Sequence, residues 1–496
     1  MKELADVALN AAQSAGAEYA DIRISRHRQQ SLSAREDHVE SVRDTESFGF
    51  GVRVLVDGTW GFAASSRVER ETIAQVARRA VATAQANRPA RRRPVELVDA
   101  PAHVGAWRTP IETDPFEVPL AEKTDVLLAA NAAAMTVAGA KYCMSWMTFQ
   151  NERKFFANTD GSAIDQDIYR TYPCLSVTAT DPATGKFETR RADVAPRGMG
   201  YEHVRQADLV GLAPRMADQA VEKLHAPSVE PGRYDLILHP SNLWLTMHES
   251  LGHPTELDRV VGLEANFAGT SFLTLDKLGA FRYGSPVVNF KADRTLPTGL
   301  ATCAYDDDGV ETTEWPLVRD GILVDYQTIR EQVLWPEYRR ARAAAGLPEV
   351  RHSYGACYAD SWSSFPFQRQ ANIHLEAGRD PLTPEELIAD TERGIYIVGD
   401  GSFSIDQQRR NFQFSGQVFY EVRDGKIAGM LNDVAYQAQT PEFWNACDAI
   451  CDERYWKMGG TLNCGKGQPP QAAKMSHGAA PARFRQINVL NTRRKV

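Results

Sequence analysis

The sequence predicts an α+β protein, in which an N-terminal α/β region with helices and a mixed or antiparallel sheet precedes a strand-rich C-terminal domain. Three observations support this prediction. Helical and alternating apolar patterns take turns over the first 225 residues, and short strand-like segments separated by glycine-containing turns fill the remainder. The chain has 496 residues, which is too long for one ordinary hydrophobic core and indicates two or three domains.

The N-terminal region, residues 1–225, contains two successions of helix, strands and helix. An alanine-rich amphipathic stretch from Glu3 to Ala15 predicts the first helix. Alternation from Tyr19 onward predicts strands, and Asp57-Gly58 predicts a hairpin turn between two of them. Further helices are predicted at residues 68–86, 120–138 and 207–225. The region is therefore interpreted as one unit or as two subdomains, 1–93 and 110–225.

The C-terminal domain, residues 226–496, begins at a stretch in which prolines and a glycine precede an apolar segment. That segment, Tyr234 to Leu238, predicts a buried strand, and Asp320-Gly321 and Asp424-Gly425 predict hairpin turns farther along. The tail from about Gln468 is polar and contains proline, so it is predicted to be loosely ordered.

The composition is that of an ordinary globular protein, with 43% hydrophobic and 24% charged residues. The formal net charge of −8 gives no general attraction to nucleic acid or to an anionic membrane, so neither is expected as a partner. The N-terminus lacks the apolar core of a signal peptide, and no apolar run is long enough to span a bilayer. Seven scattered cysteines favour reduced thiols, and hence a cytoplasmic protein.

The segment from His239 to Asp258 carries the side chains best suited to chemistry. Pro240 begins a predicted helix that bears His248, Glu249 and His253. Their pattern, H-E-x-x-x-H, has one residue more than the H-E-x-x-H motif of zinc peptidases. In a regular α-helix, residues i and i+5 are rotated by roughly 140°, so two imidazoles at that spacing would not share a metal ion.

Two neighbouring residues favour a departure from regular helix at this point. Gly252 permits unusual backbone angles, and Pro254 disfavours helical geometry at His253. The helix is therefore expected to end or widen there and to bring His253 back toward His248. Zinc at such a site lowers the pKa of a water molecule and polarises a carbonyl, and Glu249 is placed to act as general base and then general acid.

Four segments resemble the TldD/PmbA family of zinc metallopeptidases, also named modulators of DNA gyrase. They are HESLGHPTELD, YADIRIS…GFGVRVLVDGTWGFAASS, GDGSFSIDQQRRNFQFSGQVFYEVRDGKIAGMLNDV and TLNCGKGQ. The resemblance extends over nearly the whole chain, to about Gln468. Because this chain retains the histidine motif, it resembles the TldD-type active subunit of that family.

The resemblance implies a ligand set of His248, His253 and Cys464 for one zinc ion per active subunit, with Glu249 as the catalytic glutamate. The residues around Cys464 also favour it as a ligand, because it lies between glycines that let the backbone approach a site closely. The resemblance further implies a homodimer, or a heterodimer with a related subunit that lacks the motif. The family's peptide substrate lies extended as an added strand, which tolerates many sequences.

Other ligand choices stay open at the level of sequence. Glu256 could bind the metal, but it is interpreted as an acceptor that orients a histidine, and Asp258 receives the same interpretation. Cys447 and Cys451 could face one way on a helix, although two partly buried thiols are favoured over a metal pair or a disulfide. His352 and Tyr354 could stabilise an oxyanion, but packing or surface positions are favoured for both.

The chain is therefore predicted to be a zinc-dependent metallopeptidase that hydrolyses unfolded proteins or short peptides with low sequence specificity, in a strand-rich C-terminal catalytic domain. One alternative is an inactive or regulatory subunit with a structural metal, which would have four closed ligands. A second alternative is another zinc hydrolase, such as an amidase, which needs the same activated water but a smaller pocket.

Overall fold

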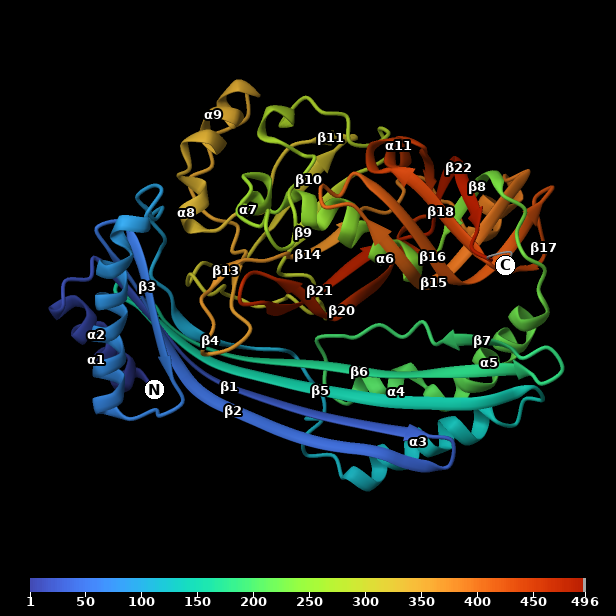
Figure 1. Cartoon of the computed structure of the whole chain (residues 1–496), viewed down its shortest axis with the longest axis horizontal. Coiled ribbons are helices and arrows are strands. Elements are labelled where there is room, and N and C mark those ends of the chain that lie inside the picture. The colour runs from blue at the N-terminus through green and yellow to red at the C-terminus, as the bar shows by residue number, and fades with distance from the viewer. Residues whose placement is uncertain (494–496) are drawn as a thin grey trace.

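The computed structural model describes residues 1–493, which form two layers (Figure 1). The N-terminal layer is a long curved sheet, with helices at one end and along its outer face. The C-terminal part of the chain packs against the opposite face of that sheet. Helices and strands are mixed throughout, so the α+β prediction is confirmed. The boundaries predicted at residues 93, 110 and 225 stay predictions.

The N-terminal sheet has the strand order β3-β2-β1-β5-β6-β4, and β7 pairs with β6. All of these pairs are antiparallel except β4 with β6. The turn predicted at Asp57-Gly58 joins β2 to β3, and both residues have positive φ. The strands are β1 (Tyr19–Arg35), β2 (His38–Val56), β3 (Thr59–Ser65), β4 (Val104–Arg108), β5 (Ala140–Asn158), β6 (Ala163–Asp181) and β7 (Lys186–Arg191).

Helices cover this sheet because each presents a stripe of small apolar residues. Ala5, Ala8 and Ala12 of the first helix are buried against the end of the sheet where Ile22 and Val52 lie. A second apolar cluster joins α3 and α5 to the distal part of β5 and β6. The helices are α1 (Lys2–Ser14), α2 (Arg70–Asn87), α3 (Leu120–Ala134), α4 (Glu202–Ala207) and α5 (Leu209–His225).

The C-terminal part contains two larger sheets and one short hairpin. One sheet has the order β11-β10-β9-β14-β21-β20, so β20 is an edge strand. In the other, β15 pairs with both β8 and β16, which closes β15, β8, β22, β18 and β16 into a five-stranded barrel. The strands of the first sheet are β9 (Phe290–Asp293), β10 (Glu314–Arg319), β11 (Ile322–Leu323), β14 (Asn372–Leu375), β20 (Lys457–Lys466) and β21 (Gln471–Ala479).

The second sheet and the remaining elements complete this part of the chain. Its strands are β8 (Gly232–Leu238), β15 (Arg393–Ile405), β16 (Asn411–Arg423), β17 (Lys426–Leu431), β18 (Val434–Gln439), β19 (Cys447–Ile450) and β22 (Ala482–Asn491), and the short hairpin is β12 (Cys357–Tyr358) with β13 (Phe367–Gln368). The helices are α6 (Pro240–Met247), α7 (Leu257–Val260), α8 (Arg330–Val333), α9 (Pro336–Ala344), α10 (Pro384–Ala389) and α11 (Thr440–Asn445).

Two local predictions are wrong. The tail from Gln468 is not loosely ordered, because residues 471–491 form β21 and β22, and β22 lies between β8 and β18. Phe484, Ile487 and Val489 of β22 are buried, so tertiary pairing overrides the polar composition of the segment. The helix considered for Cys447 and Cys451 is absent from the described residues, since β19 occupies Cys447–Ile450. The favoured interpretation of the pair as two buried thiols holds, because both are free and buried. Residues 494–496 lie outside the described part of the chain.

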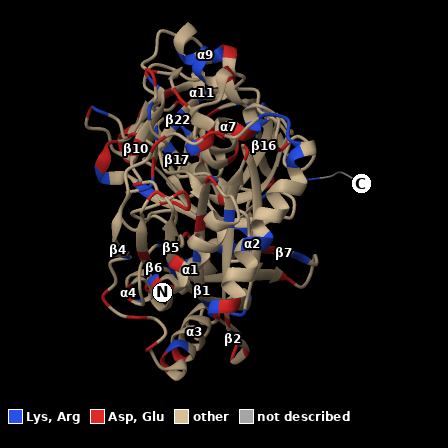
Figure 2. Cartoon of the chain, turned by 90° about the vertical axis from the view of Figure 1, so that its left-hand side faces the viewer, with Lys and Arg blue, Asp and Glu red and all other residues tan. Residues whose placement is uncertain are grey.

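Buried ion pairs join the two layers. Arg53 of β2 bonds to Asp21 of β1 and to Asp308 of the C-terminal part, at 2.7 Å to each carboxylate. Lys154 of β5 contacts Asp307 at 2.8 Å, and the side chains in these pairs are almost fully buried. Elsewhere, Lys and Arg are interspersed with Asp and Glu in both layers (Figure 2).

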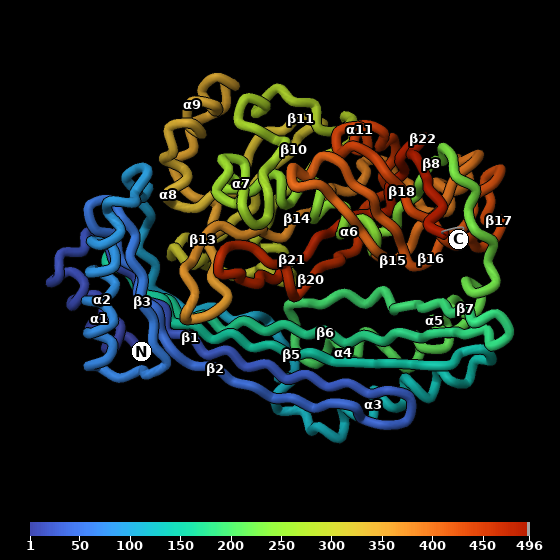
Figure 3. The backbone as a smooth tube through the Cα atoms, in the orientation of Figure 1, coloured from blue at the N-terminus to red at the C-terminus, as the bar shows by residue number. Residues whose placement is uncertain are grey.

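The backbone trace in Figure 3 places the two ends of the described chain toward opposite ends of the long axis. The same view shows β20 and β21 on the side of the C-terminal part that faces the N-terminal sheet. None of the helices within residues 1–493 has the length and apolar run that crossing a membrane requires.

Candidate metal centre

The H-E-x-x-x-H motif lies on a helix that changes its pitch. The α-helix α6 ends at Met247, and His248–Gly252 form a π-helical turn in which the N–H of His253 donates to the carbonyl of His248. This i to i+5 hydrogen bond sets the two histidines above one another, and their ring centroids lie 4.7 Å apart. The predicted widening of the helix is confirmed.

Gly252 makes the wide turn possible by its lack of a side chain. A Cβ at this position would lie 2.2 Å from Oε1 of Gln370, which is itself buried. Pro254 is the second residue of a short 3-10 turn, His253–Thr255, and the backbone leaves helical geometry at Glu256. The two residues singled out in the sequence therefore sit where the helix widens and ends.

Cys464 reaches the same place from a distant part of the chain. It lies in the edge strand β20, where the pairing with β21 shifts register between Thr461 and Cys464. Its Sγ is 3.6 Å from Nε2 of His253. One donor atom from each of His248, His253 and Cys464 falls within 4.8 Å of the others, and all three side chains are buried. The structure thus brings together the three residues predicted as ligands.

A network of buried charges holds His253 in place. Nδ1 of His253 lies 2.7 Å from Oε2 of Glu256, which leaves Nε2 directed at Cys464. Glu256 also accepts from Nζ of Lys466 at 3.0 Å. Asp258 bonds to Lys466 at 2.8 Å, so its link to His253 passes through Lys466 and Glu256. A carboxylate that accepts from one ring nitrogen sets the tautomer that frees the other nitrogen for a metal.

His477 contacts the other histidine and was missed in the sequence. Its Nε2 lies 2.8 Å from Nδ1 of His248, so one of these nitrogens donates to the other. His477 belongs to β21, and it pairs there with Gly459 of β20. The signal that could have found it is the alternation of small and polar residues over 471–479, which the prediction of a loose tail obscured.

Glu249 is buried beside the two histidines and contacts the guanidinium of Arg409. Burial raises the pKa of Glu249, and the positive charge of Arg409 opposes that rise. Arg409 lies in the turn between β15 and β16 and has positive φ, at 65°. Sequence reasoning did not single it out, although the QRR run in this turn was visible.

The chemistry of the three donors fits zinc. Burial lowers the pKa of both His248 and His253 well below the usual range, so each presents a neutral imidazole. Burial raises the pKa of Cys464 to about 11, which means that the thiolate requires a nearby cation to persist at neutral pH. Two imidazoles with one thiolate are a set that zinc accepts and that hard cations avoid.

Tyr354, which the sequence left open as an oxyanion-stabilising group, and two histidines outside the motif have other partners. The hydroxyl of Tyr354 donates to Asp325 at 2.8 Å, and its ring stacks on Trp315. His239 caps α6, where its ring accepts from the N–H of Ser241. His374 lies in β14 against Trp456.

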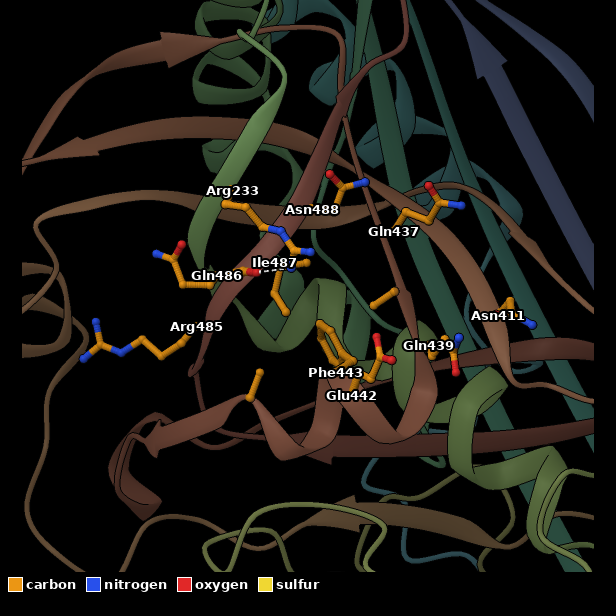
Figure 4. Close-up of a pocket in the computed structure, with 12 residues that line it drawn as sticks. Arg233, Asn411, Gln437, Gln439, Glu442, Phe443, Arg485, Gln486, Ile487 and Asn488 are labelled. Atoms are coloured by element: carbon orange, nitrogen blue, oxygen red, sulfur yellow. Dashed lines mark hydrogen bonds between the residues drawn. The ribbon is translucent and has the colours of Figure 1, made fainter.

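A cavity of about 530 Å³ lies away from the three donors, beside β18, α11 and β22 (Figure 4). Its lining is rich in amide side chains, such as Gln437, Gln439 and Asn488. Another cavity, of about 400 Å³, borders Trp244 of α6, whose ring lies 6.4 Å from that of His248.

The protein has an α+β fold, and it buries two imidazoles and a thiol next to a glutamate. These features define it as a protein with a candidate metal site. Matches to three family domains identify the group more closely. Residues 20–84 match PmbA/TldA metallopeptidase domain 1, residues 113–226 match the central domain, and residues 231–490 match the C-terminal domain. The chain belongs to the PmbA/TldD metallopeptidase family.

Similar proteins agree with this membership. A protein named metalloprotease from Methanothermobacter thermautotrophicus is 26% identical over 475 residues, which cover 96% of each chain. A zinc metalloprotease TldD homolog from Saccharolobus solfataricus is 22% identical, over 88% of this chain and 90% of the relative. The crystal structure of a candidate modulator of a DNA gyrase from Thermotoga maritima has the same fold, with a TM-score of 0.73, 17% identity, and coverage of 99% of this chain and 100% of that one.

Proposed function

We propose that this chain is a zinc-dependent peptidase of the TldD type, which hydrolyses peptide bonds in unfolded proteins or short peptides with little sequence preference. The observation that carries the proposal is the convergence of His248, His253 and Cys464, with Glu249 on the same helical turn. The three residues would hold one zinc ion. When bound, zinc supplies Lewis-acid chemistry, which polarises a carbonyl and lowers the pKa of water.

The chain's own residues perform the proton transfers. The carboxylate of Glu249 takes a proton from the attacking water and passes it to the nitrogen of the leaving amine. Arg409 contacts that carboxylate and fixes its direction, so it acts as a positioning residue. Glu256 holds His253 through Nδ1, and the buried Lys466 holds Glu256 in turn. These contacts support a site whose geometry is set before substrate arrives.

We further propose that the protein acts in the cytoplasm as a homodimer, or as a heterodimer with a relative that lacks the motif. The free edge of β2 supports an interface. Within residues 1–493, the strand pairing of residues 38–49 of β2 is with β1 alone, since the pairing with β3 begins at Phe50. Val39, Val42 and Phe48 are exposed along this edge. An open strand edge with exposed apolar side chains favours association with another chain.

The test compares wild type with Glu249→Ala and Cys464→Ser, each with and without a co-expressed motif-lacking relative. Zinc content and cleavage of an unstructured reporter peptide are measured on the same samples. We expect about one zinc per chain in wild type and Glu249→Ala, less in Cys464→Ser, and cleavage by wild type alone. If wild type holds zinc but cleaves the peptide neither with nor without the relative, a regulatory subunit with a structural metal would be favoured. Cleavage of small amides but not of peptides would favour an amidase.

A further inference from the structure

The cavity beside Trp244 lies at one end of the strand that carries Cys464. Its volume is about 400 Å³, and residues 457–462 of β20 form one wall. Residues 191–197, which begin at the last residue of β7, also line it. Trp244 lines the cavity, and its ring lies 6.4 Å from that of His248. Leu462, at the end of the lining stretch of β20, precedes Cys464 by two positions, so the cavity and the metal centre lie along the same strand.

The acidic side chains of the cavity are already engaged. Asp193 accepts from both terminal nitrogens of Arg190. Asp400 accepts from Arg191 at 2.5 Å, and it lies 3.3 Å from Nε1 of Trp244. Burial lowers the pKa of the remaining candidate base, His239, to about 4, so this imidazole is neutral near pH 7.

The basic side chains of the cavity are not all engaged. Arg197 donates through Nη2 to the carbonyl of Met458 at 3.0 Å. Within residues 1–493, its buried Nη1 has no hydrogen-bond partner, and no carboxylate lies within ion-pair distance of it. Burial lowers the pKa of Arg197 to about 10, which still leaves it charged at neutral pH. Lys457 is exposed at the start of β20, and it too forms no ion pair with any described residue.

A desolvated guanidinium without an anion is costly, and an incoming carboxylate relieves that cost. The planar fork of arginine matches the two oxygens of a carboxylate. Because β20 is an edge strand, a peptide added to it would extend from the metal centre toward Met458. Cys464 is six positions beyond Met458, and six steps of extended chain span roughly 20 Å.

We propose that Arg197 and Lys457 form a binding site for the terminal carboxylate of the peptide substrate. The proposal rests on the peptidase function proposed above, and it makes that function selective for peptides with a free carboxyl end about six residues from the metal centre. A side-chain carboxylate of Asp or Glu has the same chemistry, so the test must separate these two sources.

Binding is measured in the Glu249→Ala background, so that cleavage does not consume the peptide. Three fluorescent decapeptides share their first nine residues. Two have the same uncharged last residue, one with a free carboxylate and one with a carboxamide, and the third ends in Asp with a carboxamide. We expect the free acid to bind about tenfold more tightly than the plain amide, since a charge-assisted hydrogen bond is lost in the latter. Adding Arg197→Met removes the difference, Lys457→Met reduces it, and Arg197→Lys retains part of it.

Arg92→Met, at an exposed arginine of the segment between α2 and β4, serves as the matched control and leaves the preference unchanged. Circular dichroism melts check that each variant is folded, and Lys457→Met supplies an exposed position if Arg197→Met unfolds. Equal binding of the free acid and the plain amide would overturn the proposal. Tight binding of the Asp peptide that Arg197→Met abolishes would identify a side-chain carboxylate as the source. The protein with Glu249 intact is tested for cleavage of the same peptides. If it cleaves none of them while the free acid still binds more tightly than the plain amide, the peptidase function is wrong but the carboxylate site is supported.

Discussion

Glu256 shows how one buried residue supports the whole metal centre. Its carboxylate contacts His253, Arg259 and Lys466, and all of these side chains are buried. The pKa of Glu256 is held well below its usual value by Lys466 and His253, which outweigh the cost of burial. These contacts support the interpretation of Glu256 as an acceptor that orients His253.

We predict that Glu256→Gln lowers zinc affinity by about 10- to 100-fold, because His253 loses the acceptor that sets its tautomer. The affinity is measured by competition with a chromophoric chelator. Glu442→Gln, at an exposed glutamate of α11, is the control and should bind zinc as wild type does. An unchanged affinity in a folded Glu256→Gln protein would show that His253 is oriented by its packing alone.

At the scale of elements, the metal centre depends on the close approach of α6 and β20. Gly459 of β20 lies under Trp244 of α6, and a Cβ added there would lie 2.2 Å from Cγ of the indole. Because His248 follows α6 and Cys464 lies on β20, this contact sets the distance between two of the three donors.

We predict that Gly459→Ala destabilises the protein by about 1–3 kcal/mol, as overpacking does, and reduces bound zinc by separating α6 from β20. The melting temperature and the zinc content are measured together. Gly105→Ala in β4 is the matched control, since an added Cβ there meets no atom within 4 Å. If Gly459→Ala melts and binds zinc like wild type, the close approach is not required.

For the whole molecule, buried ion pairs connect the N-terminal sheet with the C-terminal part of the chain. Arg53 connects Asp21 of the sheet with Asp308, and removal of the guanidinium leaves two buried carboxylates without their cation. Breaking a buried pair in this way costs much more than breaking an exposed one.

We predict that Arg53→Met lowers the free energy of unfolding by about 3–5 kcal/mol. Arg26→Met removes an exposed pair with Glu46 of the same sheet and should cost about 0–1 kcal/mol. Urea unfolding followed by tryptophan fluorescence compares the two variants. Similar midpoints for both would mean that apolar packing, and not this ion pair, holds the layers together.

Local patterns predicted most of the helices and strands, and they singled out His248, Glu249 and His253 of the candidate metal centre. Alternation identified the strands on either side of Asp57-Gly58, and small apolar residues at helical spacing identified α1 and α5. Gly252 and Pro254 marked the place where the helix departs from α geometry, but not through the backbone angles expected of them, because both Gly252 and His253 keep helical φ and ψ. Gly252 is needed there for the close approach of Gln370. The family resemblance directed attention to Cys464, which spacing alone would not have joined to His248.

The sequence by itself determined the helical turn that carries His248, Glu249 and His253, since these residues lie close together in the chain. It also determined the fold class and the family, through local patterns and motifs that recur along most of its length. Tertiary structure alone decided which distant residues complete the site. His477 and Arg409 reach it from β21 and from the turn after β15, and Arg197 reaches the neighbouring cavity from beyond the N-terminal sheet. Strand pairing between segments far apart in the sequence sets these contacts. The alternation of apolar and polar residues predicts that a segment is a strand, but it does not predict which strand it pairs with.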